Sequence, residues 1–302
     1  MHLFRQSFDN CLKGFDQMKT TFKTMLAFAV ICAIASPSMA DVHDGLINYW
    51  NFDGNFDDTA GSIPGNTSTK ADNGSQPGSA VSLANWTDDN PDAAALGQYG
   101  VFDGTSEGYV EVRDSADIVR AGGAVSISAW LRVNSFTKGW QALLAHGEGS
   151  DYRIARRGGG SNIMSYAGGT GDIPTNDSTG PNVNDGNWHH VVAISPIFMD
   201  QAGSQLWVDG VQVATGGNTA VSDNGSGRLM IGGNPDTGGF RTWHGDIEDV
   251  GMWDRPLTGE EIGLIFTSGQ NGVPLSAIPE PSTGLLIMLA AGAVPFFRRR
   301  RR

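Results

Sequence analysis

The sequence predicts an all-β domain, a two-layer sandwich of antiparallel strands with one short helix near its C-terminal end. Two features of the composition support this prediction. Gly accounts for 42 of the 302 residues, and 25 Asp stand against 7 Glu, a balance that favours turns over helices. The third feature is a period of two in the apolar residues, which is typical of strands with one face turned to a core.

The clearest strand is expected over residues 124–133. Apolar residues alternate there with the others, so one face consists of Val125, Ile127, Ala129, Leu131 and Val133. Shorter runs bounded by turn residues predict further strands at 45–52, 108–112, 187–195 and 228–232. His189 and His190 are neighbours on one of these strands and must face opposite sides of it. They cannot share a metal ion, and we expect His190 to pack beside the core.

A hairpin is expected at residues 205–215, because Asp209-Gly210 lies between β-prone arms and is typical of a type I′ turn. The stretches 54–98 and 158–186 are rich in Gly, Asn, Asp, Ser and Thr. We expect both stretches to be long loops over a rigid sandwich.

The predicted helix follows residue 258. Thr258 and Glu261 have the spacing of a capping box, and Leu257 and Ile262 occupy the positions of a hydrophobic staple. Apolar residues recur at helical spacing after this start, and Gly269 can end the helix.

The charge of the chain excludes one class of partner. The formal net charge is −12, and residues 41–277 hold 29 acidic residues against 11 Lys and Arg, a net charge of −18. A nucleic-acid-binding protein needs a basic surface, so we expect no nucleic acid as a partner. Both cysteines, Cys11 and Cys32, precede residue 41. A chain of this length can bury a core without disulfides.

Residues 1–40 are typical of an export signal. The segment from Met18 carries Lys19 and Lys23, then an apolar run at 25–35, then small residues that end at Ala40. The apolar run is too short for a permanent membrane span. Two acidic residues before Met18 do not suit a signal, so either translation starts at Met18 or the N-terminal region is unusually long. We expect cleavage after Ala40.

Residues 273–302 form a tail with three parts. The first, Pro279-Glu280-Pro281, is stiff, because each Pro fixes φ and disfavours helix in the residue before it. Residues 283–297 carry no charge, span roughly 22 Å as a helix and predict a short transmembrane segment. The third part, Arg298–Arg302, stops translocation on the cytoplasmic side. The order resembles the PEP-CTERM sorting signal of Gram-negative bacteria. The resemblance implies an exosortase-type membrane enzyme as a partner, transient anchoring, and delivery to the cell envelope or the extracellular matrix.

Residues 41–272 are expected to form one domain, and six motifs in it resemble the LamG-like jelly roll of the concanavalin A-like lectin/glucanase superfamily. The motifs are INYWNFDGNFDDTAG, VFDGTSEGYVEV, VSISAWLRV, GNWHHVVA, LWVDGVQVA and IGGNPDTGGFRTWHGDIEDVGMWDRPLTGEEI. The resemblance implies a concanavalin A-like jelly-roll sandwich, a structural Ca²⁺ in many members, and functions from glycan binding to adhesion. The insertion at 62–98 is longer than is usual in that family, so the resemblance does not place this region.

The same superfamily contains glycoside hydrolases, so an enzyme is an alternative. Laminarinase-type members carry Glu-x-Asp-x-x-Glu on one strand, which supplies the paired carboxylates of the reaction. Here Glu248 is followed by Asp249, but no acid occupies the remaining position, and Glu107 and Glu111 share a strand face without a third acid. We therefore expect no catalytic residue.

An acidic turn at residues 53–58 predicts a cation site, because Ca²⁺ prefers carboxylate, amide and carbonyl oxygens. The turn begins like an EF-hand loop and then departs from that pattern. The family resemblance places Asp53 near Asp249, and we predict a structural Ca²⁺ held by Asp53, Asp57 and Asp249. A second acidic loop at 87–92 is a weaker candidate, and either loop can also be a solvated turn.

The preferred function is an exported binding module at the cell surface or in the matrix, with an extracellular polysaccharide or other glycan as its partner. Trp140, Tyr152 and Tyr166 lie in or beside predicted loops, where they can stack on sugar rings, although core positions are the alternative. A structural or adhesive envelope protein without a small ligand is the second hypothesis. A hydrolase or lyase is the third.

Both ends of the chain should be removed in the native protein. We expect the mature protein to start at Asp41 and to lack everything after Pro279-Glu280-Pro281, because the two ends have the patterns of export and sorting signals. N-terminal sequencing and intact mass of protein from the native host measure this. A mature mass that still includes Arg298–Arg302 would contradict sorting and indicate a plain membrane anchor.

Overall fold

A computed structural model describes residues 41–63, 66, 72–76, 81–85, 97–113, 118–148, 151–169, 171–197, 203–217, 221–222, 227–237 and 241–280. The predicted export signal, the transmembrane segment 283–297 and the acidic loop 87–92 lie outside these ranges. Within them, no helix has the length and apolar character needed to cross a membrane.

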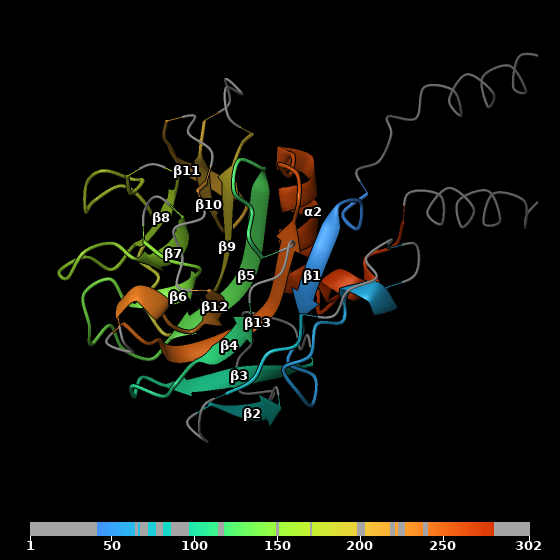
Figure 1. The fold of residues 1–302 in the computed structure, drawn as a ribbon, viewed down its shortest axis with the longest axis horizontal. Coiled ribbons are helices and arrows are strands. Elements are labelled where there is room, and N and C mark those ends of the chain that lie inside the picture. The colour runs from blue at the N-terminus through green and yellow to red at the C-terminus, as the bar shows by residue number, and fades with distance from the viewer. Residues whose placement is uncertain are drawn as a thin grey trace, which may run out of the picture. The chain divides into compact units, whose positions relative to one another are not determined.

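The described residues form a sandwich of two antiparallel sheets, which confirms the predicted fold class (Figure 1). The larger sheet has the order β11-β10-β9-β5-β13-β3-β2, and β1 pairs with β13 beside this path. The smaller sheet has the order β4-β12-β6-β7-β8. The strands are β1 (Leu46–Trp50), β2 (Val81–Asn85), β3 (Gln98–Asp103), β4 (Val110–Arg113), β5 (Val125–Val133), β6 (Ala142–Ala145), β7 (Tyr152–Arg156), β8 (Met164–Gly168), β9 (Trp188–Ser195), β10 (Gln205–Val208), β11 (Val211–Thr215), β12 (Arg228–Ile231) and β13 (His244–Trp253).

Two of these strands correct the sequence prediction. Strand β2 lies inside the stretch expected as a loop at 54–98, and β8 lies inside the stretch 158–186. Neither strand has a strong signal of its own, because small and polar residues dominate both. Each is formed through its neighbour: β2 pairs along its length with β3, and β8 pairs with β7.

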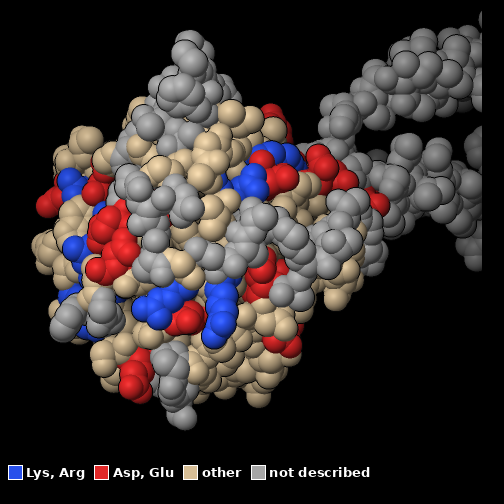
Figure 2. Space-filling view, in the orientation of Figure 1, with Lys and Arg blue, Asp and Glu red and all other residues tan. Residues whose placement is uncertain are grey.

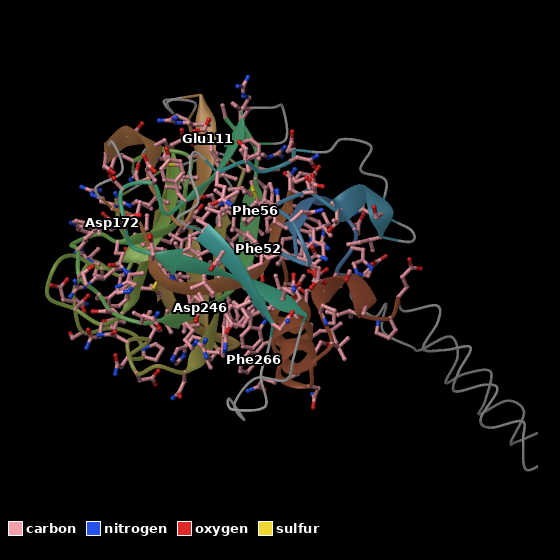
Figure 3. All side chains as sticks on the ribbon, turned by 90° about the horizontal axis from the view of Figure 1, so that it is seen from below. Phe52, Phe56, Glu111, Asp172, Asp246 and Phe266 are labelled. Carbon is pink, nitrogen blue, oxygen red and sulfur yellow. The ribbon has the colours of Figure 1, made fainter. Side chains whose placement is uncertain are left out.

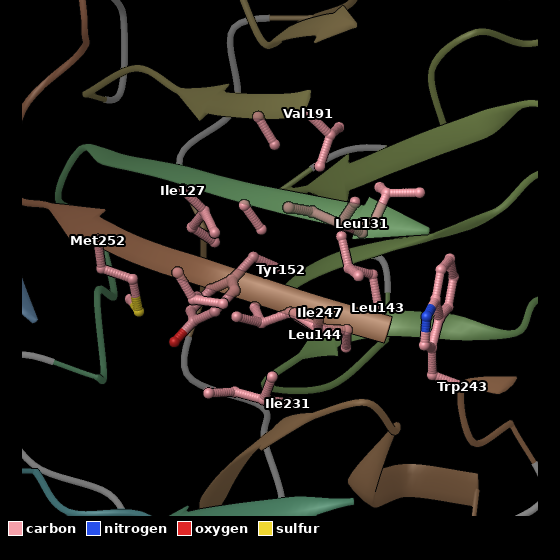
Figure 4. Close-up of a cluster of buried hydrophobic side chains, with 14 of the residues drawn as sticks. Ile127, Leu131, Leu143, Leu144, Tyr152, Val191, Ile231, Trp243, Ile247 and Met252 are labelled. Carbon is pink, nitrogen blue, oxygen red and sulfur yellow. The ribbon is translucent and has the colours of Figure 1, made fainter. Parts of the chain in front are cut away.

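The main core lies between the two sheets. The apolar face predicted for β5 points into it, where Ile127 and Leu131 meet Val191 of β9 and Ile247 of β13 (Figure 4). The opposite face of β5 is buried as well, since Ser126, Ser128 and Trp130 are at most 2% exposed. The large sheet is therefore covered on both faces.

A second layer covers the outer face of the large sheet. It consists of helix α2 (Gly259–Gln270) and the short 3-10 helix η3 (Leu275–Ala277), which pack on apolar residues of β1, β9 and β13. His190 lies in this layer, where its Nε2 is 2.7 Å from the Ser128 hydroxyl and its ring packs on Trp130 and Phe266. Burial lowers the pKa of His190 to about 4. The predicted packing role of His190 is confirmed.

The turn and helix signals are confirmed in detail. Asp209 and Gly210 have φ values of 52° and 73°, as a type I′ turn requires. The Thr258 hydroxyl accepts from the Glu261 N–H at 3.2 Å, and a Glu261 carboxylate oxygen accepts from the Thr258 N–H at 2.7 Å. The helix continues to Gln270, one residue past Gly269. Gly269 is needed for another reason, because a Cβ there would lie 2.4 Å from the Trp130 ring.

The folded domain extends beyond the predicted end at residue 272. Leu275 and Ile278 are 1% and 3% exposed and belong to the apolar layer under α2. The Leu275 N–H donates to a carboxylate oxygen of Asp249 at 3.0 Å. The last buried residue therefore directly precedes Pro279-Glu280-Pro281, and a cut in that motif leaves the layer intact.

A chain that ends at Gly272 should be less stable than one that ends at Glu280. The shorter chain loses the burial of Leu275 and Ile278, and one buried side chain of this size contributes about 1.5–3 kcal/mol. We expect a loss of about 3 kcal/mol or more in the free energy of unfolding, measured by urea denaturation. Equal denaturation midpoints for the two chains would show that residues 273–280 are not part of the folded domain.

Candidate functional site

The candidate site lies at one end of the small sheet, where two loops meet. One loop runs from Phe136 to Trp140 and leads into β6, and the other runs from Arg157 to Ser161 and follows β7. The Trp140 N–H donates to the Gly158 carbonyl at 2.8 Å. We call the side chains on these two loops, together with the residues that bind them, the Trp140 rim.

Trp140 has a left-handed backbone conformation, with φ of 56°, which is strained for a large side chain. Three other described non-glycine residues also have positive φ, and each has a structural reason. Phe52 fills the core, Asp209 forms the hairpin turn, and Asp249 lies at a bulge where it accepts two hydrogen bonds. Trp140 instead presents a half-buried side chain at the surface. This conformation and exposure make Trp140 a candidate for contact with a ligand.

Two arginines lie over the Trp140 ring. The guanidinium carbons of Arg153 and Arg157 are each 4.9 Å from its centroid, a distance typical of cation–π contacts. Arg153 is buried and is held by Glu148 and, at 2.6 Å, by Asp172. Figure 3 shows Asp172 well away from Phe266 on helix α2, so this site is separate from the layer on the large sheet.

Arg157 is held loosely by comparison. Its Nη2 donates to the Thr175 carbonyl at 2.9 Å, and its Nε lies 3.6 Å from an Asp177 oxygen. The Asp177 side chain is 61% exposed, and such exposed pairs contribute about 1 kcal/mol or less. The Arg157 Nε is buried and makes no hydrogen bond. Arg157 can therefore move, whereas Arg153 is fixed.

Two further cations of the rim are bound by neutral oxygens. Arg156 donates to the carbonyls of Ser161 at 2.7 Å and Lys138 at 3.0 Å, and burial lowers its pKa. The Lys138 ammonium donates to the Thr242 hydroxyl at 2.5 Å and to the Gly104 carbonyl. Burial lowers the pKa of Lys138, although the negative charge of Asp103 opposes this.

The glycines of the second loop leave backbone donors open. Gly158 has φ of 63°, and Gly159 and Gly160 are exposed. Within the described ranges, the N–H groups of Gly159 and Gly160 have no acceptor. The rim thus combines an aromatic ring, arginine–carboxylate pairs and free N–H groups. Such a set can hydrogen-bond hydroxyl or anionic groups while the ring packs on an apolar face.

The prediction that Tyr152 and Tyr166 stack on sugars is wrong. Both are 0% exposed and belong to the core between the sheets. The Tyr152 hydroxyl donates to the Ile118 carbonyl at 2.7 Å, and the Tyr166 hydroxyl lies 2.8 Å from that of Ser195. The signal that could have placed Tyr152 is its alternation with Ile154, since residues two apart on a strand share a face.

The structure does not assemble the predicted calcium ligands. Asp53 lies in the turn after β1, where one of its oxygens accepts from the Gln98 N–H at 2.7 Å. The N–H of Asp57 donates to Asn55 in the same turn. Among the residues that the structure describes, no three acidic, His or Cys side chains converge in a way that could hold a metal ion. The charge of Asp53 is near enough to raise the pKa of Asp249, and calcium binding by Asp53, Asp57 and Asp249 stays a prediction.

Asp249 has a structural role instead. It is 4% exposed, and its two oxygens accept from the Tyr49 hydroxyl and the Leu275 N–H. Burial raises the pKa of Asp249 to about 6, the two donors oppose this rise, and the nearby charge of Asp53 adds to it. A carboxylate with both oxygens engaged by the protein in a closed apolar layer is a poor metal ligand.

Sequence reasoning missed the role of Asp58 in the acidic turn. Its carboxylate is buried and accepts from the backbone N–H groups of Tyr49 at 2.8 Å and Ala60 at 3.0 Å, and from the Asn48 amide at 3.0 Å. The turn is thus fixed to β1 by hydrogen bonds. Asp58 stands two residues before Ala60, a spacing typical of an Asx turn, and that was the available signal.

The acids considered for catalysis are also dispersed. Glu111 lies on the small sheet and pairs with Arg228 at 2.8 Å, whereas Glu248 is buried on the large sheet. Figure 3 shows Glu111 far from Asp246, the other acid on the outer face of β13. Figure 2 shows acidic and basic side chains interspersed on the face in view, with no extended basic surface for nucleic acid there.

The fold and the rim define a concanavalin A-like jelly-roll domain with a polar, aromatic site on its loops. The comparison with family models agrees: residues 103–263, just over half of the chain, match the concanavalin A-like lectin/glucanases superfamily. The chain belongs to this family. No curated protein matches it.

Solved structures with the same fold are distant in sequence. Domain 4 of AbnA, an extracellular arabinanase of family GH43 from Geobacillus stearothermophilus solved with arabinotriose, has a TM-score of 0.51 and 17% identity over 72% of this chain and 96% of its own. The binding domain of Paraclostridial Mosquitocidal Protein 1 has a TM-score of 0.54 and 14% identity over 76% of this chain. The botulinum neurotoxin DC binding domain, solved with rat synaptotagmin II, has a TM-score of 0.50 and 15% identity over 76% of this chain. This chain spans only 53% of each toxin domain.

Replacing Asp249 by Ala should destabilise the domain equally with and without calcium. The change leaves the Tyr49 hydroxyl and the Leu275 N–H without acceptors in a buried layer, a loss of about 2–4 kcal/mol. Thermal melting in EDTA and in millimolar Ca²⁺ measures it, with Asp53→Ala as the matched variant in the exposed turn. A loss confined to the calcium buffer would restore Asp249 as a metal ligand.

Proposed function

We propose that the protein is an exported module that binds polysaccharide through the Trp140 rim. The observation that carries this proposal is the strained, half-exposed Trp140, which no need of the core explains. The family membership supports it, and so does the likeness to a domain that was solved with a bound arabinose oligosaccharide.

Binding requires that one face of the Trp140 ring becomes accessible. Arg153 is fixed by two carboxylates, so that side of the ring stays covered. Arg157 is held by the Thr175 carbonyl at 2.9 Å and by a 3.6 Å pair with the exposed Asp177, and it can move aside at a cost of about 1–2 kcal/mol. A sugar ring then packs on the Arg157 side. Arg157 and the free glycine N–H groups supply hydrogen bonds to its substituents.

We place this activity in the cell envelope or the extracellular matrix, with an exosortase-type enzyme acting on the chain at the membrane. The support is the order of the two terminal signals in the sequence. We further propose that the protein has no catalytic activity, because its candidate acids lie apart. A structural Ca²⁺ remains a proposal for the turn at 53–58.

A protein partner is the second candidate, and the toxin domain solved with synaptotagmin II is the observation that favours it. Glycan arrays separate the two candidates, because a protein-binding module would give no saturable glycan signal.

Replacing Trp140 by Ala should weaken glycan binding by about tenfold or more, because stacking of an aromatic ring on a ligand contributes about 1–1.5 kcal/mol beyond the area that it buries. Isothermal titration with the strongest glycan from an array measures the change. Trp207 on β10 is a half-buried tryptophan of the large sheet, and Trp207→Phe is the matched control. Unchanged affinity in a folded Trp140→Ala protein would move the site elsewhere.

A further inference from the structure

The rim holds an unusual share of the positive charge of the domain. Residues 41–277 contain 11 Lys and Arg within a net charge of −18. Five of these cations belong to the rim or bind its carboxylates: Lys138, Arg153, Arg156, Arg157 and Arg241.

Direct partners neutralise only part of this charge. Arg153 and Arg241 share Glu148, and Arg153 also binds Asp172, so two cations meet two carboxylates. Lys138 and Arg156 donate to carbonyl and hydroxyl oxygens, with no carboxylate among the partners that accept from them. Dipoles hold the charge of Arg156, and for Lys138 the nearby negative charge of Asp103 adds to them.

Arg157 adds a third cation with weak compensation. The Asp177 side chain is 61% exposed and 3.6 Å away, and the Arg157 Nε lacks an acceptor. Buried or half-buried cations without a counterion are unfavourable. An anionic group placed against Arg157 would relieve this, and charge-assisted hydrogen bonds to a guanidinium are roughly twice as strong as neutral ones.

The neighbouring loop offers further donors for such a group. Gly159 and Gly160 are exposed, and their N–H groups have no acceptor in the part of the chain that the structure describes. Gly158 has left-handed φ, and successive N–H groups around a left-handed residue form a concavity that suits anions. The three glycines directly follow Arg157 in the chain.

From these observations we infer that the Trp140 rim selects an acidic saccharide, with the anionic substituent of the sugar bound by Arg157 and the Gly159 and Gly160 N–H groups. The inference rests on the proposed polysaccharide-binding function and names its ligand class. A uronic-acid carboxylate and a sulfate ester share this chemistry. The net charge of −18 does not prevent binding, because fields beyond about 8 Å are screened at physiological ionic strength, and a short oligosaccharide reaches only the rim.

Asp177 gives the inference its sharpest test. As the loosely held counterion of Arg157, it competes with an anionic ligand for the same guanidinium. Removing its charge should therefore improve binding of an acidic sugar and leave a neutral sugar unaffected. A structural role of Asp177 would change both alike.

The experiment titrates the full chain with three short probes: trigalacturonate, its methyl ester, and a sulfated galactan oligosaccharide of similar length. The ester keeps the rings and removes the charge. We expect at least one acidic probe to bind about tenfold more tightly than the ester. The probe that does so distinguishes carboxylate from sulfate.

Four variants then locate the preference. Arg157→Gln should abolish the difference between acid and ester, and Asp177→Asn should strengthen binding of the acid several-fold without changing the ester. Arg228→Gln is the matched control, because Arg228 is also half-exposed and paired with one carboxylate, but lies on β12. Trp140→Ala should weaken all probes.

The outcomes separate the two proposals. Binding of acid and ester with equal affinity, both sensitive to Trp140→Ala, would overturn the inference and keep the proposed function. The inference would also be overturned if Arg157→Gln left the preference for the acid unchanged, or if Asp177→Asn did not strengthen binding of the acid. Failure of the folded chain to bind any glycan on an array would overturn the proposed function itself.

Discussion

The buried carboxylate of Asp249 holds the beginning and the end of the domain together. It accepts hydrogen bonds from Tyr49 on β1 and from Leu275 on η3, residues that lie 200 and 26 positions away in the chain. Strand β1 pairs with β13 alone in the described structure. Pairing β1 with β13 brings together two segments about 200 residues apart in the chain, which is entropically unfavourable. The contacts between these two strands therefore decide whether β1 stays in the sheet.

The backbone is shaped to place this carboxylate. Asp249 has φ of 53°, and the pairing of β13 with β5 shifts register between Glu248 and Gly251. Such a bulge leaves an extra residue on one strand and redirects its side chain. Asp249 can then point into the layer under α2 while Ile247 and Val250 remain in the main core. The strain in β13 is thus compensated by two buried hydrogen bonds.

Closure at Asp249 also explains where a functional site can lie. Once η3 and α2 cover the large sheet, its outer face has polar groups that serve the fold: the Ser126 hydroxyl donates to the Arg255 carbonyl at 2.8 Å and accepts from the Leu257 N–H at 3.0 Å. Loops at the end of the small sheet remain open to ligands. Loops held on a rigid sandwich are where binding residues concentrate, and Trp140 lies on one.

The sequence predicted what local chemistry determines and failed where the tertiary structure decides. The alternation in β5, the Asp209-Gly210 turn and the Thr258–Glu261 cap each contain their own physical reason, and all three are present. The burial of Tyr152 and the hydrogen-bond partners of Asp249 depend on residues far away in the chain. A carboxylate can bind either a cation or hydrogen-bond donors, and the sequence around Asp249 does not distinguish the two. The structure gives it donors, the hydroxyl of Tyr49 on β1 and the N–H of Leu275 on η3.

The same distinction bears on Trp140, which sequence reasoning named without seeing why it stands out. Glycine would adopt φ of 56° without strain, whereas a non-glycine residue costs about 1–2 kcal/mol there. The two loops touch at Gly139 and Gly159, and the absence of side chains at both positions already allows this contact. The contact between the two loops therefore does not itself require a large ring at position 140. What the ring adds is cation–π contact with Arg153 and Arg157, a contact that a glycine could not make. Under the proposed function, the strain at Trp140 is retained because the same ring also packs on a ligand.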